Sequence, residues 1–314
     1  MTSLSASLVR GAVTSPFKHP GRPGATLPTD RLTLLAAPAA PGPLAAYRRI
    51  CGFPRSAPRP GSGPGSGSWP DASSGSSSGP LPLTYPHVLA FPLAMRLMTA
   101  RRFPLPVVGL VHTWIEIVAR RPVQSDEALE LTVYAEELTP HRRGTEVTMV
   151  TEARVAGALV WESRSGYLSR HATTAAGSTR EADGSPTLPA VAEWRLPGDL
   201  GRRYGAVSGD RNPIHLHPLT ARLFGFPRAI AHGMWTVARC LAEADGQTGE
   251  IRSVRADFRA PVLLPATVTY AADPAGNAFA LRSESSSGSG PGTGGGGGGG
   301  GGRVHLTGSV TRTS

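Results

Sequence analysis

The residues best suited to chemistry are concentrated in one segment, from 203 to 241. Within it, Asp210 and His215 are five positions apart and are joined by the turn-forming pair Asn212-Pro213. This spacing lets a carboxylate and an imidazole converge on one water molecule while the backbone stays fixed. Such general acid–base catalysis is worth about 10²–10⁴ in rate. The residue types alone leave open which of the two side chains takes the proton from the water.

A glycine further along the segment offers a group of a different kind. Gly233 follows His232 and opens an apolar helix expected over residues 231–245. The backbone N–H of a glycine at a helix start is unpaired, is aided by the positive end of the helix dipole and allows close approach of a ligand. Gly233 is therefore suited to stabilise negative charge on a reacting oxygen, a contribution of about 10²–10³ in turnover.

Other residues of the segment are candidates for lining a substrate site or for holding its shape: Tyr204, Ser208, Asn212, His232 and Met234. Asn212 is expected to hold the turn through backbone hydrogen bonds, and His232 to order the loop before Gly233. His217 is assigned to the surface. No metal site is predicted, because the three histidines of the segment have no carboxylate or cysteine at ligand spacing.

The stretch from Tyr204 to His215 resembles, position for position, the hydratase-2 signature of MaoC-like enzymes, which are (R)-specific enoyl-thioester hydratases and dehydratases. GFPRAIAHGM at 225–234 and FRAPVLLPATV at 258–268 are similar to the same family. The resemblance implies that Asp210 and His215 act as a catalytic pair, and that Gly233 donates to the thioester oxygen. It implies reversible dehydration of (3R)-hydroxyacyl thioesters in fatty-acid metabolism, with no cofactor.

The first half of the chain resembles actinobacterial 3-hydroxyacyl-thioester dehydratases, through residues 82–99, GLVHT at 109–113 and HRRG at 141–144. It also pairs weakly with the second half. Tyr85-Pro86 falls opposite Phe226-Pro227, and the same offset places Pro92 opposite Gly233. An internal duplication follows, and with the family it implies an α+β double hot-dog fold. Because proline has no N–H, the first half is expected to be non-catalytic and to line the acyl channel.

Hydrophobic periodicity and turn residues predict the elements of both halves. A strand and a short helix ending at Gly52 are expected between Asp30 and Phe53, and another helix at 91–99. Gly246 is expected to cap the helix at 231–245. Strands are expected at 107–118, 128–138, 145–171, 253–260, 266–272, 278–283 and 303–312.

Shifts in composition divide the chain into ordered and polar stretches. Residues 1–29 read as a disordered lead, and an N-terminal repeat spans 30–171 with a disordered insert at 56–80. A polar linker at 172–190 leads to the catalytic repeat at 191–314. Within that repeat, the Gly/Ser-rich tract at 284–302 is interpreted as a long hairpin loop, which costs little entropy.

The net charge of +10 suits partners that carry phosphate or acidic groups, namely coenzyme A or an acyl carrier protein. Nucleic acid is not expected, because the arginines are dispersed and no aromatic residues are interleaved with them. Two cysteines cannot build a disulfide framework, and no apolar run reaches the length of a membrane span, so a cytoplasmic location is expected. The two repeats form a pseudo-dimer within a monomer, or the chain pairs further as a homodimer.

Two other functions compete with the dehydratase interpretation. One is thioester hydrolysis, which is disfavoured because hot-dog thioesterases lack the Asp-x-Asn-Pro-x-His turn. The other is a non-catalytic acyl-thioester-binding partner subunit, which is disfavoured because Asp210, His215 and Gly233 are all present.

Overall fold

The computed structural model describes residues 18, 25–35, 39–54, 79–173, 188–245, 249–283 and 302–313. Most of the expected lead, insert, linker and Gly/Ser-rich loop lies outside these ranges, and so does Gly246. The predictions made for those stretches are therefore not addressed by the described residues.

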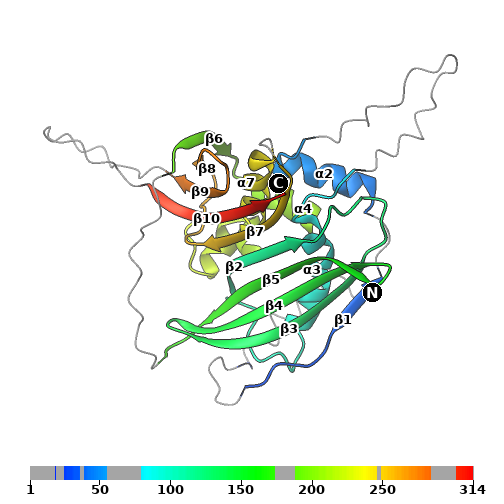
Figure 1. Ribbon diagram of the computed structural model, residues 1–314. Coiled ribbons are helices and arrows are strands. Elements are labelled where there is room, and N and C mark those ends of the chain that lie inside the picture. Colours follow the sequence, from blue (N-terminus) through cyan, green and yellow to red (C-terminus); the bar gives the residue numbers. More distant parts are fainter. Residues whose placement is uncertain are drawn as a thin grey trace, which may run out of the picture.

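One antiparallel sheet of ten strands runs through both halves of the chain (Figure 1). The strands of the first half are β1 (Leu32–Leu35), β2 (Val111–Ala119), β3 (Glu130–His141), β4 (Gly144–Val155) and β5 (Ala158–Arg170). Those of the second half are β6 (Ala190–Leu196), β7 (Ile251–Phe258), β8 (Ala266–Ala272), β9 (Ala278–Ser283) and β10 (Arg303–Arg312). The order across the sheet is β1-β3-β4-β5-β2-β7-β10-β9-β8-β6. The two halves therefore join at a single seam, where β2 pairs with β7 from Trp114↔Asp257 to Val118↔Ser253.

Each half packs one long helix against its own strands. The helix α3 (Tyr85–Met98) contacts β1, β3 and β4, and α7 (Gly233–Ala244) contacts β9. The helices α4 (Leu200–Ser208), α5 (Pro213–Leu216) and α6 (Pro218–Leu223) come between β6 and α7 in the chain. This is the double hot-dog arrangement that the sequence led us to expect. Among the helices of the described ranges, none is long and apolar enough to cross a membrane.

The first helix of the chain, α2 (Pro41–Cys51), ends at Gly52 in the left-handed conformation, as predicted. It belongs to the first half but contacts α4 and α7 of the second (Figure 1). The ring of Tyr47 lies 5.0 Å from Tyr85 on α3 and 6.2 Å from Tyr204 on α4, and the Tyr47 hydroxyl pairs with Thr84 Oγ1 at 2.7 Å. The α2 helix thus fixes the distance between the central helix of the first half and the segment that carries the signature.

The helix expected at 91–99 in fact begins at Tyr85, so the predicted start is wrong. Pro86 fits because proline is tolerated in the first turn, and Pro92 lies inside the helix. Burial on nearly all sides stabilises α3 in spite of the internal proline. The pairing of Pro92 with Gly233 is therefore also wrong. The first two residues of α3 still offer no free amide, since Tyr85 N–H donates to Pro82 O at 2.8 Å and Pro86 has no N–H.

Two strand predictions also need correction. The run at 145–171 is two strands, β4 and β5, because Ala156 and Gly157 both have positive φ (48° and 79°) and form a tight hairpin turn. The strand β6 was not predicted. It begins at Ala190, where the polar linker expected at 172–190 ends. Its pairing with β8 and the burial of Trp194 and Leu196 hold it at the edge of the sheet. The strands β8, β9 and β10 have the bounds that were expected.

Candidate active site

The helix α4 brings the predicted turn into place through two glycines on one face. A Cβ atom on Gly201 would lie 1.9 Å from the His215 carbonyl oxygen, and one on Gly205 would lie 2.7 Å from the Asp210 carbonyl oxygen. The helix ends at Ser208, whose Oγ donates to Tyr204 O (3.0 Å) and accepts from Asp210 N (3.2 Å). Close backbone contact therefore fixes where Asp210 leaves the helix.

The turn itself is held by side chains that accept from the backbone. The Asp210 carboxylate accepts from Asn212 N through Oδ1 (3.1 Å), and Asn212 Oδ1 accepts from Ile214 N (3.3 Å) as the N-cap of α5. Asn212 has the turn-holding contact expected for it. The short helix α5 then carries His215. Ile230 N donates to Ile214 O (3.1 Å), and this hydrogen bond closes the segment between Ile214 and Ile230 at its base.

The His215 ring is oriented by a backbone carbonyl. Its Nδ1 lies 2.8 Å from Ile230 O, and since a carbonyl only accepts, Nδ1 carries the hydrogen. The other ring nitrogen, Nε2, is left with a free lone pair. Burial lowers the pKa of His215 below its usual value, although the Asp210 charge and the hydrogen bond to Ile230 raise it in part. At neutral pH the side chain is therefore an uncharged base.

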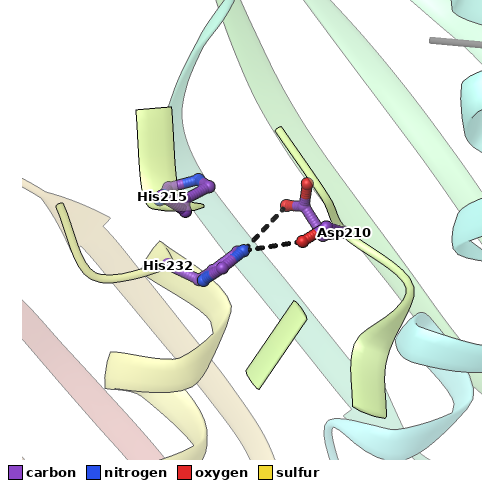
Figure 2. A group of neighbouring side chains, drawn as sticks. All are labelled: Asp210, His215 and His232. Carbon is purple, nitrogen blue, oxygen red and sulfur yellow. Dashed lines mark hydrogen bonds and ion pairs between the residues drawn. The ribbon is translucent and has the colours of Figure 1, made fainter. Parts of the chain in front are cut away.

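His232 ties Asp210 to the start of α7. Its Nε2–H donates to the Asp210 carbonyl oxygen at 2.9 Å and lies 3.8 Å from Oδ2 of the same residue (Figure 2). Its ring stacks on His215, with 3.6 Å between centroids, and lies 4.9 Å from the Tyr204 ring. Burial, together with the neighbouring His215, lowers the pKa of His232 to about 3. His232 is thus a neutral donor that positions Asp210.

One oxygen of Asp210 and one nitrogen each of His215 and His232 all lie within 4.8 Å of one another. Two groups at this separation can share one water molecule, since each hydrogen bond spans about 2.8 Å. The argument made above against a metal, that no carboxylate stands at ligand spacing, is wrong, because Asp210 does. Each neutral histidine keeps one lone pair, on Nε2 of His215 and Nδ1 of His232, but Nε2 of His232, which lies 3.8 Å from the Asp210 carboxylate, carries a hydrogen and cannot be a ligand there.

The tip of α7 lies next to this group. Gly233 is the first residue of the helix, its N-cap His232 makes no side-chain capping bond, and no described residue accepts from the Gly233 N–H. The Phe258 ring covers the glycine, since a Cβ atom there would lie 2.8 Å from it. The helix tip therefore keeps a free amide beside an apolar wall.

The other predicted residues occupy different surroundings. Tyr204 is buried against Tyr47 and His232, and Met234 is half-buried at the tip of α7. His217 is exposed, as expected, and its Nδ1 accepts from Leu219 N at 3.2 Å, which caps α6. His217 therefore lies outside the cluster of the other two histidines.

Sequence reasoning missed three residues of the first half that lie near the site. His112 on β2 stacks on Tyr167 of β5 with 4.5 Å between ring centroids, lies nearly parallel to His87 of α3, and is 4.7 Å from the Phe258 ring that covers Gly233. The two histidines occur in apolar stretches, YPHVLAF and GLVHT. An isolated histidine in such a stretch is the pattern that could have drawn attention to them.

Comparison with known sequences supports the resemblance. The MaoC-like domain model matches residues 188–282. The 3-hydroxyacyl-thioester dehydratase X of Mycobacterium tuberculosis is 40% identical over 189 residues, which is 60% of this chain and 68% of that protein. The fatty acid synthase subunit beta of Aspergillus oryzae is 47% identical over 75 residues, which is 22% of this chain and only 4% of that protein.

Comparison with solved structures agrees with this. The crystal structure of HtdX of M. tuberculosis has a TM-score of 0.67 at 30% identity, covering 90% of this chain and 100% of that chain. The MaoC-like dehydratase of Phytophthora capsici has a TM-score of 0.64 at 17% identity, over 92% of this chain and 97% of that one, and shows the shared fold alone. Since a dehydratase of this type is 40% identical over two thirds of its length, the chain belongs to the MaoC-like dehydratase family.

Proposed function

We propose that the protein catalyses the reversible dehydration of (3R)-hydroxyacyl thioesters to trans-2-enoyl thioesters, with Asp210 and His215 as the catalytic pair. The observation that carries this proposal is the placement of the Asp210 carboxylate and an uncharged His215 within 4.8 Å, close enough to share a water molecule. The dehydratase activity of the relative supports the reaction class.

In the hydration direction, the water lies between Asp210 and the bare Nε2 of His215. One of the two takes a proton from the water as its oxygen bonds to C3, and that proton is then delivered by the pair to C2, so the water supplies both the hydroxyl and the hydrogen that are added. The C2=C3 double bond becomes a single bond, and the charge that develops on the thioester oxygen is stabilised by the Gly233 N–H. Dehydration runs through the same steps in reverse.

The neutral state of the two histidines favours this scheme. If His232 were charged, its Nε2, 3.8 Å from Asp210 Oδ2, would compete for the carboxylate and make it a weaker base. Its pKa of about 3 keeps it uncharged at pH 7. His232 is then a positioning residue, Ser208 Oγ accepts from the Asp210 backbone N–H, and the Asn212 backbone N–H donates to the Asp210 carboxylate.

We assign catalysis to the second repeat. The tip of α7 has a free amide at Gly233, whereas at the tip of α3 the Tyr85 N–H is already bonded and Pro86 has none. A phosphate-bearing thioester handle, coenzyme A or the phosphopantetheine of a carrier protein, suits the arginines exposed around the signature. These are Arg202, Arg203, Arg211, Arg222 and Arg228.

The test is hydration of crotonyl-CoA and longer 2-enoyl-CoA thioesters, followed by loss of the conjugated enoyl absorbance. Asp210→Asn and His215→Ala should each lower kcat by about 10²-fold or more, with unchanged circular dichroism. His217→Ala, which alters an exposed histidine of the same segment, is the matched control. Chiral chromatography of the product should give the (3R) alcohol.

Other outcomes distinguish the competing functions. Release of free thiol without loss of the enoyl band would indicate a thioesterase. Tight binding of acyl-CoA with neither change would indicate a non-catalytic partner subunit. Near-parent turnover by Asp210→Asn or by His215→Ala would refute the role assigned to that residue.

A further inference from the structure

Two histidines of the first repeat lie beside the proposed catalytic pair and have no part in the reaction above. His87 on α3 is 8% exposed, and its Nδ1 has no protein hydrogen-bond partner among the described residues. In the same ranges Nε2 of His112 is also buried without a protein partner. The two rings are nearly parallel, at 11°, and their centroids are 6.4 Å apart. Buried polar atoms are almost always hydrogen-bonded, so two open nitrogens on neighbouring parallel rings suggest a binding site.

A β-bulge turns His112 toward this place. In the pairing of β2 with β5, His112 faces Tyr167 and Trp114 faces Gly166, so one extra residue of β2 lies between them. The bulge places His112 on the same face of the sheet as the buried Ile115, which pairs with Ser165. Bulges of this kind commonly redirect a side chain next to an active site.

The histidines are connected to the proposed active site through the Phe258 ring. The Phe258 ring, which covers Gly233, lies 4.7 Å from the His112 ring. His87 lies beside His112 with its ring nearly parallel, at 6.4 Å between centroids, and so is on the same side of the site. His87 and His112 therefore form the first-repeat side of the same reaction site.

The protonation states define what this side of the site can bind. Burial lowers the pKa of His87 to about 4 and that of His112 to about 3, so both are neutral at pH 7. A neutral imidazole has one N–H donor and one lone pair, so the open nitrogen of each ring is either a donor or an acceptor. An anionic group would be repelled by Asp210, and a plain methylene chain would leave both nitrogens unpaired. A neutral oxygen, as in a hydroxyl or a carbonyl, can accept from one ring, and a hydroxyl can also donate to the other.

We propose that His87 and His112 form a subsite for a neutral oxygen-bearing group, a hydroxyl or a carbonyl, on the acyl chain beyond C3. The placement rests on the proposed function, in which Asp210 and His215 act at C2 and C3 and Gly233 at the thioester oxygen. The far part of the acyl chain is then left for the first repeat. That repeat contributes polar specificity as well as an apolar channel.

The test compares pairs of 2-enoyl-CoA thioesters of equal length. One member is a plain alkyl chain, and the other carries a hydroxyl or keto oxygen at successive positions past C3. The parent protein should show kcat/KM about ten-fold higher for the oxygenated member at one position. His87→Leu and His112→Leu should each abolish this preference, and His217→Ala, on the exposed surface, should keep it. Equal kcat/KM at every position in the parent, or a preference that survives both leucine variants, overturns the subsite.

Binding without reaction separates this proposal from the proposed function. Isothermal titration calorimetry of the parent with saturated acyl-CoA, with and without the oxygen, should show about ten-fold tighter binding of the oxygenated member. That result without any hydration would remove the proposed reaction and keep the subsite; hydration with equal binding of both ligands would do the opposite. If a leucine variant does not fold, His87→Asn or His112→Asn, which keeps polar atoms, should retain part of the preference, and the calorimetry of the parent still decides.

Discussion

Replacement of Gly201 by alanine tests how firmly α4 holds the turn that carries Asp210 and His215. A Cβ atom at this position would lie 1.9 Å from the His215 carbonyl oxygen, and Cβ contacts under 3.0 Å essentially do not occur. Because 1.9 Å is about 1.1 Å short of that limit, either the helix or the turn must move by about that amount. The obstacle is backbone rather than a flexible side chain, so a rotamer change cannot relieve it.

The displacement should appear in both stability and rate. Overpacking of this kind costs about 1–3 kcal/mol of unfolding free energy. A misplacement of about 1 Å in a catalytic group can lower the rate by about 10²-fold. The clash is with the His215 backbone, so the ring is displaced with it. This movement strains the hydrogen bond from Nδ1 to Ile230 O that orients the ring. We therefore expect kcat/KM for enoyl-CoA hydration to fall by about 10²-fold in Gly201→Ala.

Two other glycines of the same region make a graded series. Gly205→Ala would place its Cβ 2.7 Å from the Asp210 carbonyl oxygen and should have a smaller effect of the same sign. Gly198→Ala, whose nearest neighbour atom is 3.8 Å away, should behave as the parent. Urea unfolding and hydration kinetics on the three variants measure both effects. An unchanged kcat/KM and urea midpoint in Gly201→Ala would refute the reasoning.

Three further predictions follow from the contacts described. The histidines with lowered pKa are His87, His112, His215 and His232, and their unfolded forms take up protons near pH 6.5 while the folded forms do not. Stability should therefore be full above about pH 6.5 and be lost as the pH falls toward 4, and equal urea midpoints at pH 7.5 and 5 would contradict this. Trp235→Phe removes the hydrogen bond from Nε1 to Ile50 O (2.9 Å) and should cost about 1 kcal/mol in urea unfolding, whereas an unchanged midpoint would show that this contact between α7 and α2 contributes nothing. A chelator should leave hydration unchanged, because the His232 nitrogen nearest the Asp210 carboxylate carries a hydrogen and cannot bind a metal beside it; loss of activity that zinc restores would point to a metal site.

The candidate site was largely predictable because its parts are local in sequence. Asp210, Asn212 and His215 occur within six positions, and Gly233 is marked by the histidine before it and the apolar helix after it. The family resemblance assigns the catalytic pair within one short stretch, so no long-range contact had to be inferred for it. The strands β8 to β10 were equally accessible, since each is an apolar run bounded by turn residues.

The missed features depend on contacts between distant parts of the chain. His112 reaches Phe258 of the second half because β2 pairs with β7, and it also needs a bulge that leaves no clear mark in the sequence. The start of α3 was misplaced because its prolines resemble helix breakers, and burial of the whole helix outweighs that local tendency. In each case tertiary structure decided what local pattern could not.

Two hydrogen bonds hold the base of the segment between Ile214 and Ile230. Ile230 N–H donates to Ile214 O, and His215 Nδ1–H donates to Ile230 O. The exposed side chains of this segment include Leu219 and Leu223, at 63% and 82% exposure. Since the anchors lie at its base, substitutions at exposed positions such as Leu219 and Leu223 should leave the separation of Asp210 and His215 unchanged.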